Sequence, residues 1–323
     1  MSNTAIIVGD RGQDGTLLRY SLEKQGIKVV GIGRNHLSGA SFYEDKSLAN
    51  CSIFNMEQVT SVIKVVQPRE VYYLAAHHVS SEQVDAGFSP IEYDYCHQTH
   101  VVGLLNFLWA IRSHSPLTRL FYAASSLVFS GVDGPFQNEE TKFTPCGFYG
   151  LTKAQGVSIC KEFRQNHGIF AASGILYNHE SVLRSDRFLS KKLIIAAHKI
   201  SLGIQEKLTL GNSMSETDWG YAPDYVDAFQ RILRIDTPDD FVIATGESHS
   251  VAEFAEIVFS CFGLDSKNYL VDNQNVLTRQ ISRKVGDSSK LRVLTSWAPT
   301  LNFKEMVTKL VSDYMNDYQS KIN

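Results

Sequence analysis

The hydrophobic positions in the first half of the chain form short apolar runs that alternate with longer amphipathic segments. The apolar runs, which predict strands, are residues 6–8, 27–32, 70–76 and 120–124. The amphipathic segments, which predict helices, are residues 16–25, 59–66, 103–112 and 151–167. Strands that alternate with helices of this length are typical of an α/β fold, in which a doubly wound parallel sheet carries helices on both faces.

The alternation is lost from about residue 174 onward. The elements predicted there are a charged helix near residues 188–200, a short strand at 208–210 and a terminal helix near 303–318. One more apolar run, at residues 242–245, is interpreted as a return of the chain to the sheet. We therefore expect a sheet domain and a smaller C-terminal lobe. The expected bounds are 1–173 for the sheet domain, with a return segment at about 222–247, and 174–221 with 248–323 for the lobe.

The composition and net charge indicate which kinds of partner to expect, but they do not indicate the reaction. The 323 residues are 43% hydrophobic and carry a net charge of −3, so neither nucleic acid nor a membrane is an expected partner. No apolar run has transmembrane length, and the N-terminus leads directly into a strand without a leader pattern. The five scattered cysteines form no CxxC pair, so neither a zinc site nor a disulfide framework is indicated. We expect a cytoplasmic protein without a bound metal.

A glycine-rich segment, 6-IIVGDRGQDGTLL-18, joins the first strand to the first helix. Glycines at such a turn let the backbone approach a pyrophosphate, and the helix N-terminus offers free N–H groups to the phosphates. A purely structural β-α turn is the alternative. Because the turn opens a β-α-β unit, we favour dinucleotide binding. The predicted cofactor-binding residues are Gly9, Gly12, Gln13, Asp14, Gly15, Arg34, Ala75, Tyr149 and Lys153.

The end of the second strand, 29-VVGIGRN-35, bears on the choice of cofactor. An acidic residue at this end would bind the ribose of NAD, whereas the chain has Arg34. An arginine suits a 2′-phosphate, so NADP is favoured and NAD stays possible. The alternative is that Arg34 is an ordinary solvated arginine.

The segment 149-YGLTK-153 separates Tyr149 from Lys153 by one helical turn, so the two side chains share a face. We expect the lysine ammonium to stabilise the phenolate and to lower the pKa of the tyrosine. The tyrosine could then exchange a proton with a sugar hydroxyl or carbonyl. Ser126, which follows a strand end, would hydrogen-bond the reacting oxygen. The alternative for Ser126 is a serine that merely caps the strand.

These motifs occur together in a known family. The chain resembles the extended short-chain dehydrogenase/reductases that act on nucleotide sugars and, more narrowly, the GDP-mannose 4,6-dehydratases. The segments that carry the resemblance are 11-RGQDGTLL-18, 72-YYLAAHH-78, 149-YGLTK-153, 174-GILYNHES-181, 208-LTLGN-212, 218-DWGYAPDYV-226, 241-FVIATGE-247 and 286-GDSSK-290. The resemblance implies a Rossmann-type domain with a substrate-binding lobe, NADP as the usual cofactor and a nucleotide sugar, here GDP-linked, as the substrate.

The resemblance also implies roles for individual residues. Ser126, Tyr149 and Lys153 match the family's catalytic trio, and the three glycines match its cofactor loop. The residues implied to bind the sugar nucleotide are Asn178, Lys191, Lys192, Gly211 and Arg279. Lysines and amides are suitable ligands for a diphosphate and a base. Exposed charges on a lobe helix are the alternative for the lysine pair.

The chain departs from the family pattern at several positions. Val128 stands two residues after the catalytic serine, where the dehydratases carry a glutamate that removes the C5 proton. Valine has no acid or base function, so C5 deprotonation lacks an obvious base. The other departures are Thr217 for an arginine, Ser52 for an acidic residue near the adenine, Leu277 for an arginine to which Arg279 and Arg283 lie close, and a seemingly longer segment at residues 77–100.

Three residues could replace the lost base. His77 and His78 follow a strand end near the expected nicotinamide, and Glu82 lies in the seemingly extended loop. A pair of loop histidines with local hydrogen bonds is the simpler interpretation. A metal role is disfavoured, because no third ligand stands at a recognisable spacing.

The remaining groups suffice for oxidation or reduction at one carbon. We therefore expect an NAD(P)-dependent oxidoreductase that acts at C4 of a GDP-type sugar, as a 4-keto-sugar reductase or a dehydrogenase. Three alternatives stay open: a GDP-mannose 4,6-dehydratase with a non-standard base, a C4 epimerase, and a catalytically silent paralogue that binds NADP and a nucleotide sugar. A homodimer or homotetramer is also expected. Its interface could use the apolar residues Val102, Leu105, Phe107 and Trp109, which could equally be core residues.

Overall fold

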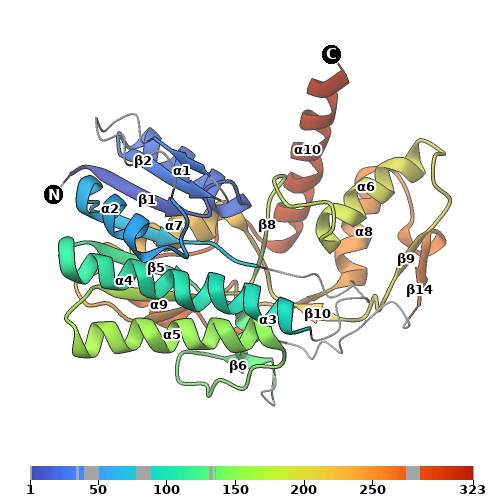
Figure 1. Cartoon of the computed structure of the whole chain (residues 1–323). Coiled ribbons are helices and arrows are strands. Elements are labelled where there is room, and N and C mark those ends of the chain that lie inside the picture. Colours follow the sequence, from blue (N-terminus) through green and yellow to red (C-terminus); the bar gives the residue numbers. More distant parts are fainter. Residues whose placement is uncertain are drawn as a thin grey trace.

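Seven strands form the central sheet, in the order β12-β7-β5-β4-β1-β2-β3 (Figure 1). The computed structural model describes residues 2–33, 36–39, 51–77, 89–130, 134, 136–273 and 284–322. The sheet strands are β1 (Thr4–Val8), β2 (Lys28–Gly33), β3 (His36–Ser38), β4 (Glu70–Tyr73), β5 (Arg119–Ala123), β7 (Ala171–Leu176) and β12 (Asp240–Ile243). Every neighbouring pair is parallel except β2 with β3. The predicted α/β class with a doubly wound parallel sheet is therefore confirmed.

Alternate residues of the sheet strands enter two different cores, one on each face. In β1, Ile6 and Val8 belong to the core that includes residues of α2, α4 and α5. Ala5 and Ile7 belong to the core that includes residues of α1, α7 and α9. All five residues of β1 are buried, as expected for a strand between two helical layers. The flanking helices are α1 (Gln13–Lys24), α2 (Met56–Val66), α4 (Gly103–His114), α5 (Phe148–Asn166), α7 (Ala222–Ile232) and α9 (Ser289–Thr295).

A third core lies in the lobe, beside the sheet. It is formed by α6 (Leu189–Ser201), α8 (Val251–Cys261), β9 (Leu208–Leu210) and α10 (Phe303–Ile322), and β14 (Leu270–Asp272) pairs with β9. Figure 1 shows these elements grouped to one side of the sheet, with the C-terminal end of α10 projecting from the body. In the part of the chain that the structure describes, none of the helices combines the length and the apolar character that crossing a membrane requires.

Short strand pairs and one irregular helix complete the structure. The pairs are β8 (Asn178–Glu180) with β11 (Trp219–Tyr221), β10 (Glu216–Thr217) with β13 (His249–Ser250), and β6 (Phe136–Gln137) with β15 (Val285–Gly286). The helix α3 (Pro90–His97) continues through a π-helical turn, η3 (Gln98–Val102), directly into α4.

The predicted elements are mostly present, with informative differences. The strand predicted at 208–210 is β9, and the predicted return to the sheet is β12, which pairs with β7. The main difference is β3, which runs antiparallel to β2. Only two residues separate Gly33 from its partner His36, and a parallel crossover needs a far longer connection. The strand predicted at 70–76 ends at Tyr73.

Candidate active site

The glycine loop connects β1 to α1 at the carboxyl end of the sheet. Gly9 has a φ of +93°, and its N–H donates to the carbonyl oxygen of Ile32 at 2.7 Å. A Cβ at Gly9 would lie 2.9 Å from the backbone nitrogen of Ala75, and a Cβ at Gly15 would lie 2.4 Å from the carbonyl oxygen of Gly9. Side chains are thus excluded at both positions. This cradle and the N-terminus of α1 beside it fit a dinucleotide pyrophosphate.

The next two predicted cofactor residues, Gln13 and Asp14, contact the segment that contains β8. The Nε2 of His179 lies 3.0 Å from a carboxylate oxygen of Asp14, and Nδ1 of His179 lies 2.8 Å from the carbonyl oxygen of Tyr177. Gln13 donates from Nε2 to the carbonyl oxygen of His179 at 3.1 Å and accepts from the hydroxyl of Ser181 at 2.9 Å. The start of α1 is therefore bonded to the chain segment that leads into the lobe.

Asp14 and His179 form a charged pair. Burial alone would raise the pKa of Asp14, but the charge and hydrogen bond of His179 lower it below its usual range. Burial likewise opposes charge on His179, and Asp14 outweighs it, so that the pKa of the imidazole is raised. Since both ring nitrogens face oxygen acceptors, the imidazolium form satisfies both of them.

The predicted catalytic residues are brought together by β5 and α5. Lys153 is fully buried, and its ammonium donates to the carbonyl oxygen of Ala123, the last residue of β5, at 2.6 Å. The same Nζ lies 5.8 Å from the ring centroid of Tyr149 and 5.0 Å from that of Tyr122. Lys153 is thus held between the end of β5 and the tyrosine one turn earlier on α5.

Ser126 begins a short 3₁₀ turn, Ser126–Phe129, that packs against the start of α5. The hydroxyl of Ser125 accepts from the N–H of Leu127 at 3.3 Å. A Cβ at Gly150 would lie 2.6 Å from the carbonyl oxygen of Leu127, so the turn touches the helix beside Tyr149. Val128 has no exposed surface and belongs to the core beneath the turn.

Burial dominates the electrostatics of the tyrosine and the lysine. Burial lowers the pKa of Lys153 to about 7. Burial also raises the pKa of Tyr149, although the tyrosine keeps some exposed surface. Our expectation that Lys153 lowers the pKa of Tyr149 is therefore wrong for this arrangement: the Nζ of Lys153 points to the carbonyl oxygen of Ala123, and burial raises the pKa of the phenol although the charge of Arg184 opposes it.

The predicted substrate residues have different surroundings. Asn178 is exposed at the start of β8. Lys191 is 9% exposed; its Nζ donates to the carbonyl oxygen of Val182 at 2.7 Å and lies 5.2 Å from the ring centroid of Tyr314. It is thus not the exposed helix charge that we considered as an alternative, whereas Lys192 is partly exposed.

Other predicted residues lie at the ends of strands or outside the described part. Gly211 is buried directly after β9. The predicted or considered residues that lie outside the described residues are Arg34, His78, Glu82, Leu277, Arg279 and Arg283. Of the departures, Thr217 lies in β10 and Ser52 is exposed ahead of α2.

His77 has local hydrogen-bond partners, as its simpler interpretation predicts. Its Nε2 lies 2.9 Å from a carboxylate oxygen of Glu92, and its ring centroid lies 5.2 Å from that of Tyr95. Its carbonyl oxygen is 3.6 Å from the thiol of Cys96. A quarter of the His77 side chain, 26%, is exposed, so the ring is still accessible from outside.

The apolar residues of α4 do not form one exposed stripe. Phe107 is fully buried in the core, whereas Trp109 is 36% exposed and stacks edge-on against Phe163 of α5 at 5.0 Å. Core packing is therefore the correct interpretation for Phe107.

Sequence reasoning assigned no role to three residues at this site. They are His179, paired with Asp14; Arg184, whose charge opposes the burial that raises the pKa of Tyr149; and His100, whose ring meets the Tyr149 ring edge-on at 5.1 Å. The segment 174-GILYNHES-181 contains His179, but its partner is 165 positions away, so the sequence alone gives no signal for the pair.

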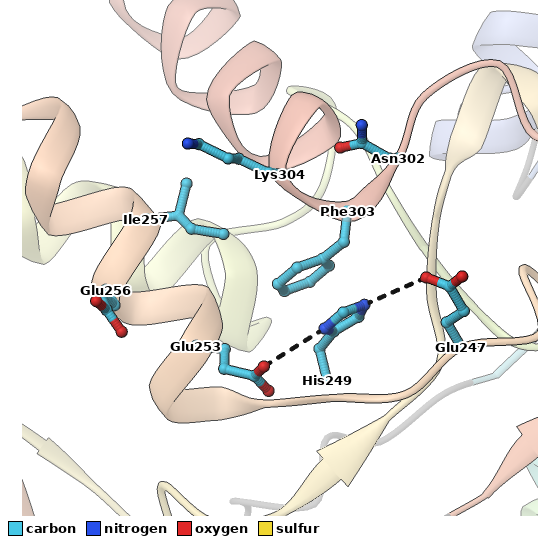
Figure 2. A pocket seen from close by; sticks show the side chains of 8 residues that line it. All are labelled: Glu247, His249, Glu253, Glu256, Ile257, Asn302, Phe303 and Lys304. Atoms are coloured by element: carbon cyan, nitrogen blue, oxygen red, sulfur yellow. Dashed lines mark ion pairs between the residues drawn. The ribbon is translucent and has the colours of Figure 1, made fainter.

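A separate hollow of about 370 Å³ lies in the lobe, where α8 meets the start of α10 (Figure 2). The His249 ring lies flat on the Phe303 ring at 3.8 Å, and its nitrogens face Glu247 at 3.8 Å and Glu253 at 3.7 Å. Across the described ranges, no cluster of three or more His, Cys, Asp or Glu side chains is arranged to hold a metal ion.

Comparison with known sequences gives one consistent result. The family model described as GDP-mannose 4,6 dehydratase matches residues 6–310. GDP-mannose 4,6 dehydratase 2 of Arabidopsis thaliana is 34% identical, over 96% of this chain and 86% of its own length. The GDP-mannose 4,6 dehydratase of Homo sapiens is 32% identical, over 96% of this chain and 90% of its own length.

Solved structures share the fold at lower sequence identity. RMD from Pseudomonas aeruginosa, complexed with NADPH, aligns with a TM-score of 0.80 at 17% identity, over 97% of this chain and 99% of its own. UDP-glucose 4-epimerase from Thermotoga maritima, with UDP-glucose, also has a TM-score of 0.80, at 18% identity, over 98% and 99% of the two chains. These matches show the Rossmann-type fold of the chain.

Proposed function

Because the chain belongs to the GDP-mannose 4,6-dehydratase family, whose members are NAD(P)-dependent enzymes of nucleotide sugars, we propose that it oxidises or reduces C4 of a GDP-linked sugar. One observation carries this proposal. Lys153 lies between the end of β5 and Tyr149, and Ser126 follows that strand end, whereas Val128, at the position of the dehydratase glutamate, is buried and apolar. The groups for proton transfer at one oxygen are present, and a base for C5 is missing from that position.

Each of Tyr149, Ser126 and Lys153 has its own role in the proposed reaction at C4. The phenol of Tyr149 donates a proton to the C4 oxygen during reduction and accepts it during oxidation. The hydroxyl of Ser126 hydrogen-bonds the same oxygen and holds it in place. Lys153, whose ammonium donates to the carbonyl oxygen of Ala123 and lies 5.8 Å from the tyrosine ring, completes the proposed catalytic set beside the phenol. When bound, the nicotinamide supplies or accepts the hydride.

We propose NADP as the preferred cofactor. The support is Arg34 after β2, in the sequence position where NAD-binding chains have an acidic residue. The structural relatives do not decide the choice, since RMD is complexed with NADPH and a dTDP-glucose 4,6-dehydratase from Bacillus anthracis with NAD.

The proposed substrate is a GDP-linked sugar that spans the sheet and the lobe. The sequence relatives, which are GDP-mannose 4,6-dehydratases by name, support the GDP group. Asn178 is exposed at the start of β8, and Lys192, Gly211 and Arg279 complete the proposed set together with Lys191. The proposed protein is a homodimer or a homotetramer, in which the exposed part of Trp109 on α4 is available for contact.

A 4,6-dehydratase with a non-standard base is the second candidate, because the sequence relatives are named as dehydratases. His77, after the end of β4, and Glu92 of α3 lie 2.9 Å apart, and this pair is a chemically suitable replacement. A carboxylate that holds one ring nitrogen leaves the other free to exchange a proton.

Incubation in deuterium oxide separates the two candidates. The protein is mixed with GDP-mannose and NADP, and the sugar nucleotide is analysed by mass spectrometry and NMR. A 4-keto-6-deoxy product with deuterium at C5 would establish the dehydratase and overturn the C4 redox proposal. Unchanged GDP-mannose, together with oxidation of NADPH when a GDP-4-keto-6-deoxy sugar is supplied, is the outcome that we expect.

A further inference from the structure

The π-helical turn η3 interrupts the long helix that runs from α3 into α4, and His100 lies at its centre. Such turns are rare and are frequent at functional sites. His100 has no exposed surface. Two buried tyrosines hold the carbonyl groups of the turn: Tyr73 donates to Thr99 at 2.6 Å, and Tyr122 donates to His100 at 3.4 Å. These two hydrogen bonds hold the backbone at His100 and therefore also hold the position of its imidazole.

The hydrogen bonds of the His100 ring define its tautomer. The backbone N–H of His77 donates to Nε2 at 3.1 Å, so Nε2 is an acceptor and has no proton. Nδ1 lies 2.8 Å from the hydroxyl oxygen of Thr152, whose own proton is donated to the carbonyl oxygen of Phe148 at 2.9 Å. Nδ1 must then be the donor to Thr152, and the ring is neutral.

These two bonds join α5 to the segment that follows β4. Thr152 lies on α5, directly before Lys153, and the His100 ring meets the Tyr149 ring edge-on at 5.1 Å and 86°. His77 lies after the end of β4. The imidazole thus connects the helix that contains both catalytic side chains to the loop that leaves the neighbouring strand.

We propose that His100 is a positioning residue that fixes Tyr149 and Lys153 relative to the end of β4, through its neutral Nδ1–H tautomer. The role rests on the proposed C4 chemistry, because it concerns where the proton-transferring phenol stands. His100 does not itself exchange a proton in this role, since both ring nitrogens are already engaged.

Substitutions at the two ends of the bond test the proposal by kinetics. His100→Phe keeps a ring against Tyr149 and removes both hydrogen bonds, and Thr152→Val keeps the shape and removes the acceptor. Each is expected to lower kcat on the order of 10- to 100-fold, with the dissociation constant of NADPH unchanged. Thr152→Ser, which keeps the hydroxyl, is expected to recover most of the loss.

A double variant distinguishes one shared contact from two independent effects on kcat. If His100 and Thr152 act through one hydrogen bond, the kcat of His100→Phe/Thr152→Val falls no further than that of the worse single variant. Losses that multiply would overturn the proposal. The control is Thr118→Val: this threonine is equally buried, and its hydroxyl donates to Pro68 at 2.6 Å before the start of β5, so kcat should stay unchanged.

A second measurement does not depend on the substrate. NMR of ¹⁵N-histidine-labelled protein at pH 7, with the His100 signals identified by their loss in His100→Phe, reports the tautomer directly. We expect a protonated Nδ1 and an unprotonated Nε2. A protonated Nε2 would overturn the proposal, because the bond from His77 could not then exist. If no GDP-linked sugar is turned over, the proposed function fails, while the tautomer still decides whether His100 makes this connection.

Discussion

The carboxylate of Asp14 lies 3.0 Å from Nε2 of His179, which connects the first turn of α1 to β8. The pKa of Asp14 is lowered and that of His179 is raised, so each group favours the charged form of the other. The stabilisation from Asp14 is present above its unfolded pKa of about 4 and is lost as pH falls further. The stabilisation from His179 is present below its unfolded pKa of about 6.5 and is lost as pH rises through its raised folded value.

We therefore expect Asp14→Asn to be most destabilising between about pH 4 and about pH 6.5, where both groups are charged. The loss should be about 2 kcal/mol near pH 5.5 and clearly smaller near pH 9, because a charge-assisted hydrogen bond is removed only where the imidazolium exists. Urea unfolding at both pH values measures it. The control is Asp227→Asn, which breaks an exposed pair with Arg231 and should cost less than about 0.5 kcal/mol at either pH. An equal loss at pH 5.5 and pH 9 would contradict the charged pair.

Lys153 should make stability rise with pH over a wide range. Its folded pKa is about 7, whereas the unfolded value is about 10.4. Between these values the unfolded chain binds a proton that the folded chain releases, which adds up to about 1.4 kcal/mol per pH unit. Lys153→Met removes this effect, so its gain in stability over the wild type should be largest below pH 7 and should vanish towards pH 10. Lys309→Met, which replaces an exposed side chain of α10, is the control and should show no such trend over pH 6–9.

Tyr149→Phe should lower kcat by about 10²- to 10⁴-fold, because the proton donor and acceptor at C4 is removed. NADPH binding, followed by its fluorescence, should weaken far less than kcat falls, because the substitution removes only the hydroxyl of this predicted cofactor-binding residue. Residual turnover of wild-type magnitude would show that another group exchanges the proton.

A carboxylate restored at position 128 should not create a dehydratase. Val128 is buried among core residues, so Val128→Glu places an unpaired polar group there and should destabilise the fold by about 2–4 kcal/mol. Thermal unfolding of this variant and of the nearly isosteric Val128→Thr gives the comparison. Deuterium incorporation at C5 by a stable Val128→Glu variant would instead mean that the 126–129 turn can direct this side chain into the site.

Substitutions of Gly9 and Gly12 should differ in their effects on stability and on cofactor affinity. Gly9→Ala introduces a Cβ 2.9 Å from Ala75 at a φ of +93°, so it should lower both stability, by about 1–3 kcal/mol, and cofactor affinity. Gly12→Ala meets only the Gly9 carbonyl oxygen, at 3.4 Å, and should keep the fold while weakening cofactor binding. Calorimetric titration with NADPH and chemical unfolding separate the two effects. Equal stability of the two variants would contradict the geometry.

The features that the sequence predicted correctly are local ones. The glycine spacing determines the turn before α1, and the four-residue spacing of Tyr149 and Lys153 places both on one face of α5. The continuous apolar run at residues 6–8 predicts a strand, and the structure shows β1 buried along its whole length between two helical layers. Each of these rests on backbone geometry within a few residues, which is the scale that a single sequence reports.

The features that it missed depend on distant partners. His100 and Thr152 are 52 positions apart, and Asp14 and His179 are 165 apart, so no periodicity connects them. The direction of the Lys153 ammonium was also unpredictable, since it is decided by the Ala123 carbonyl oxygen of a neighbouring strand. Tertiary packing decides all three contacts.

The return of the chain to the sheet through β12 has a consequence for how the protein is made. β12 pairs with β7, but the chain forms β8, α6, β9 and α7 between them, so the sheet stays incomplete while the first part of the lobe is synthesised. During that interval β7 is an open, apolar strand edge, the kind of surface on which nascent chains associate wrongly. This side of β7 is covered only when β12 has paired along it, from Ser173 to Leu176, so the order of synthesis determines how long β7 stays open.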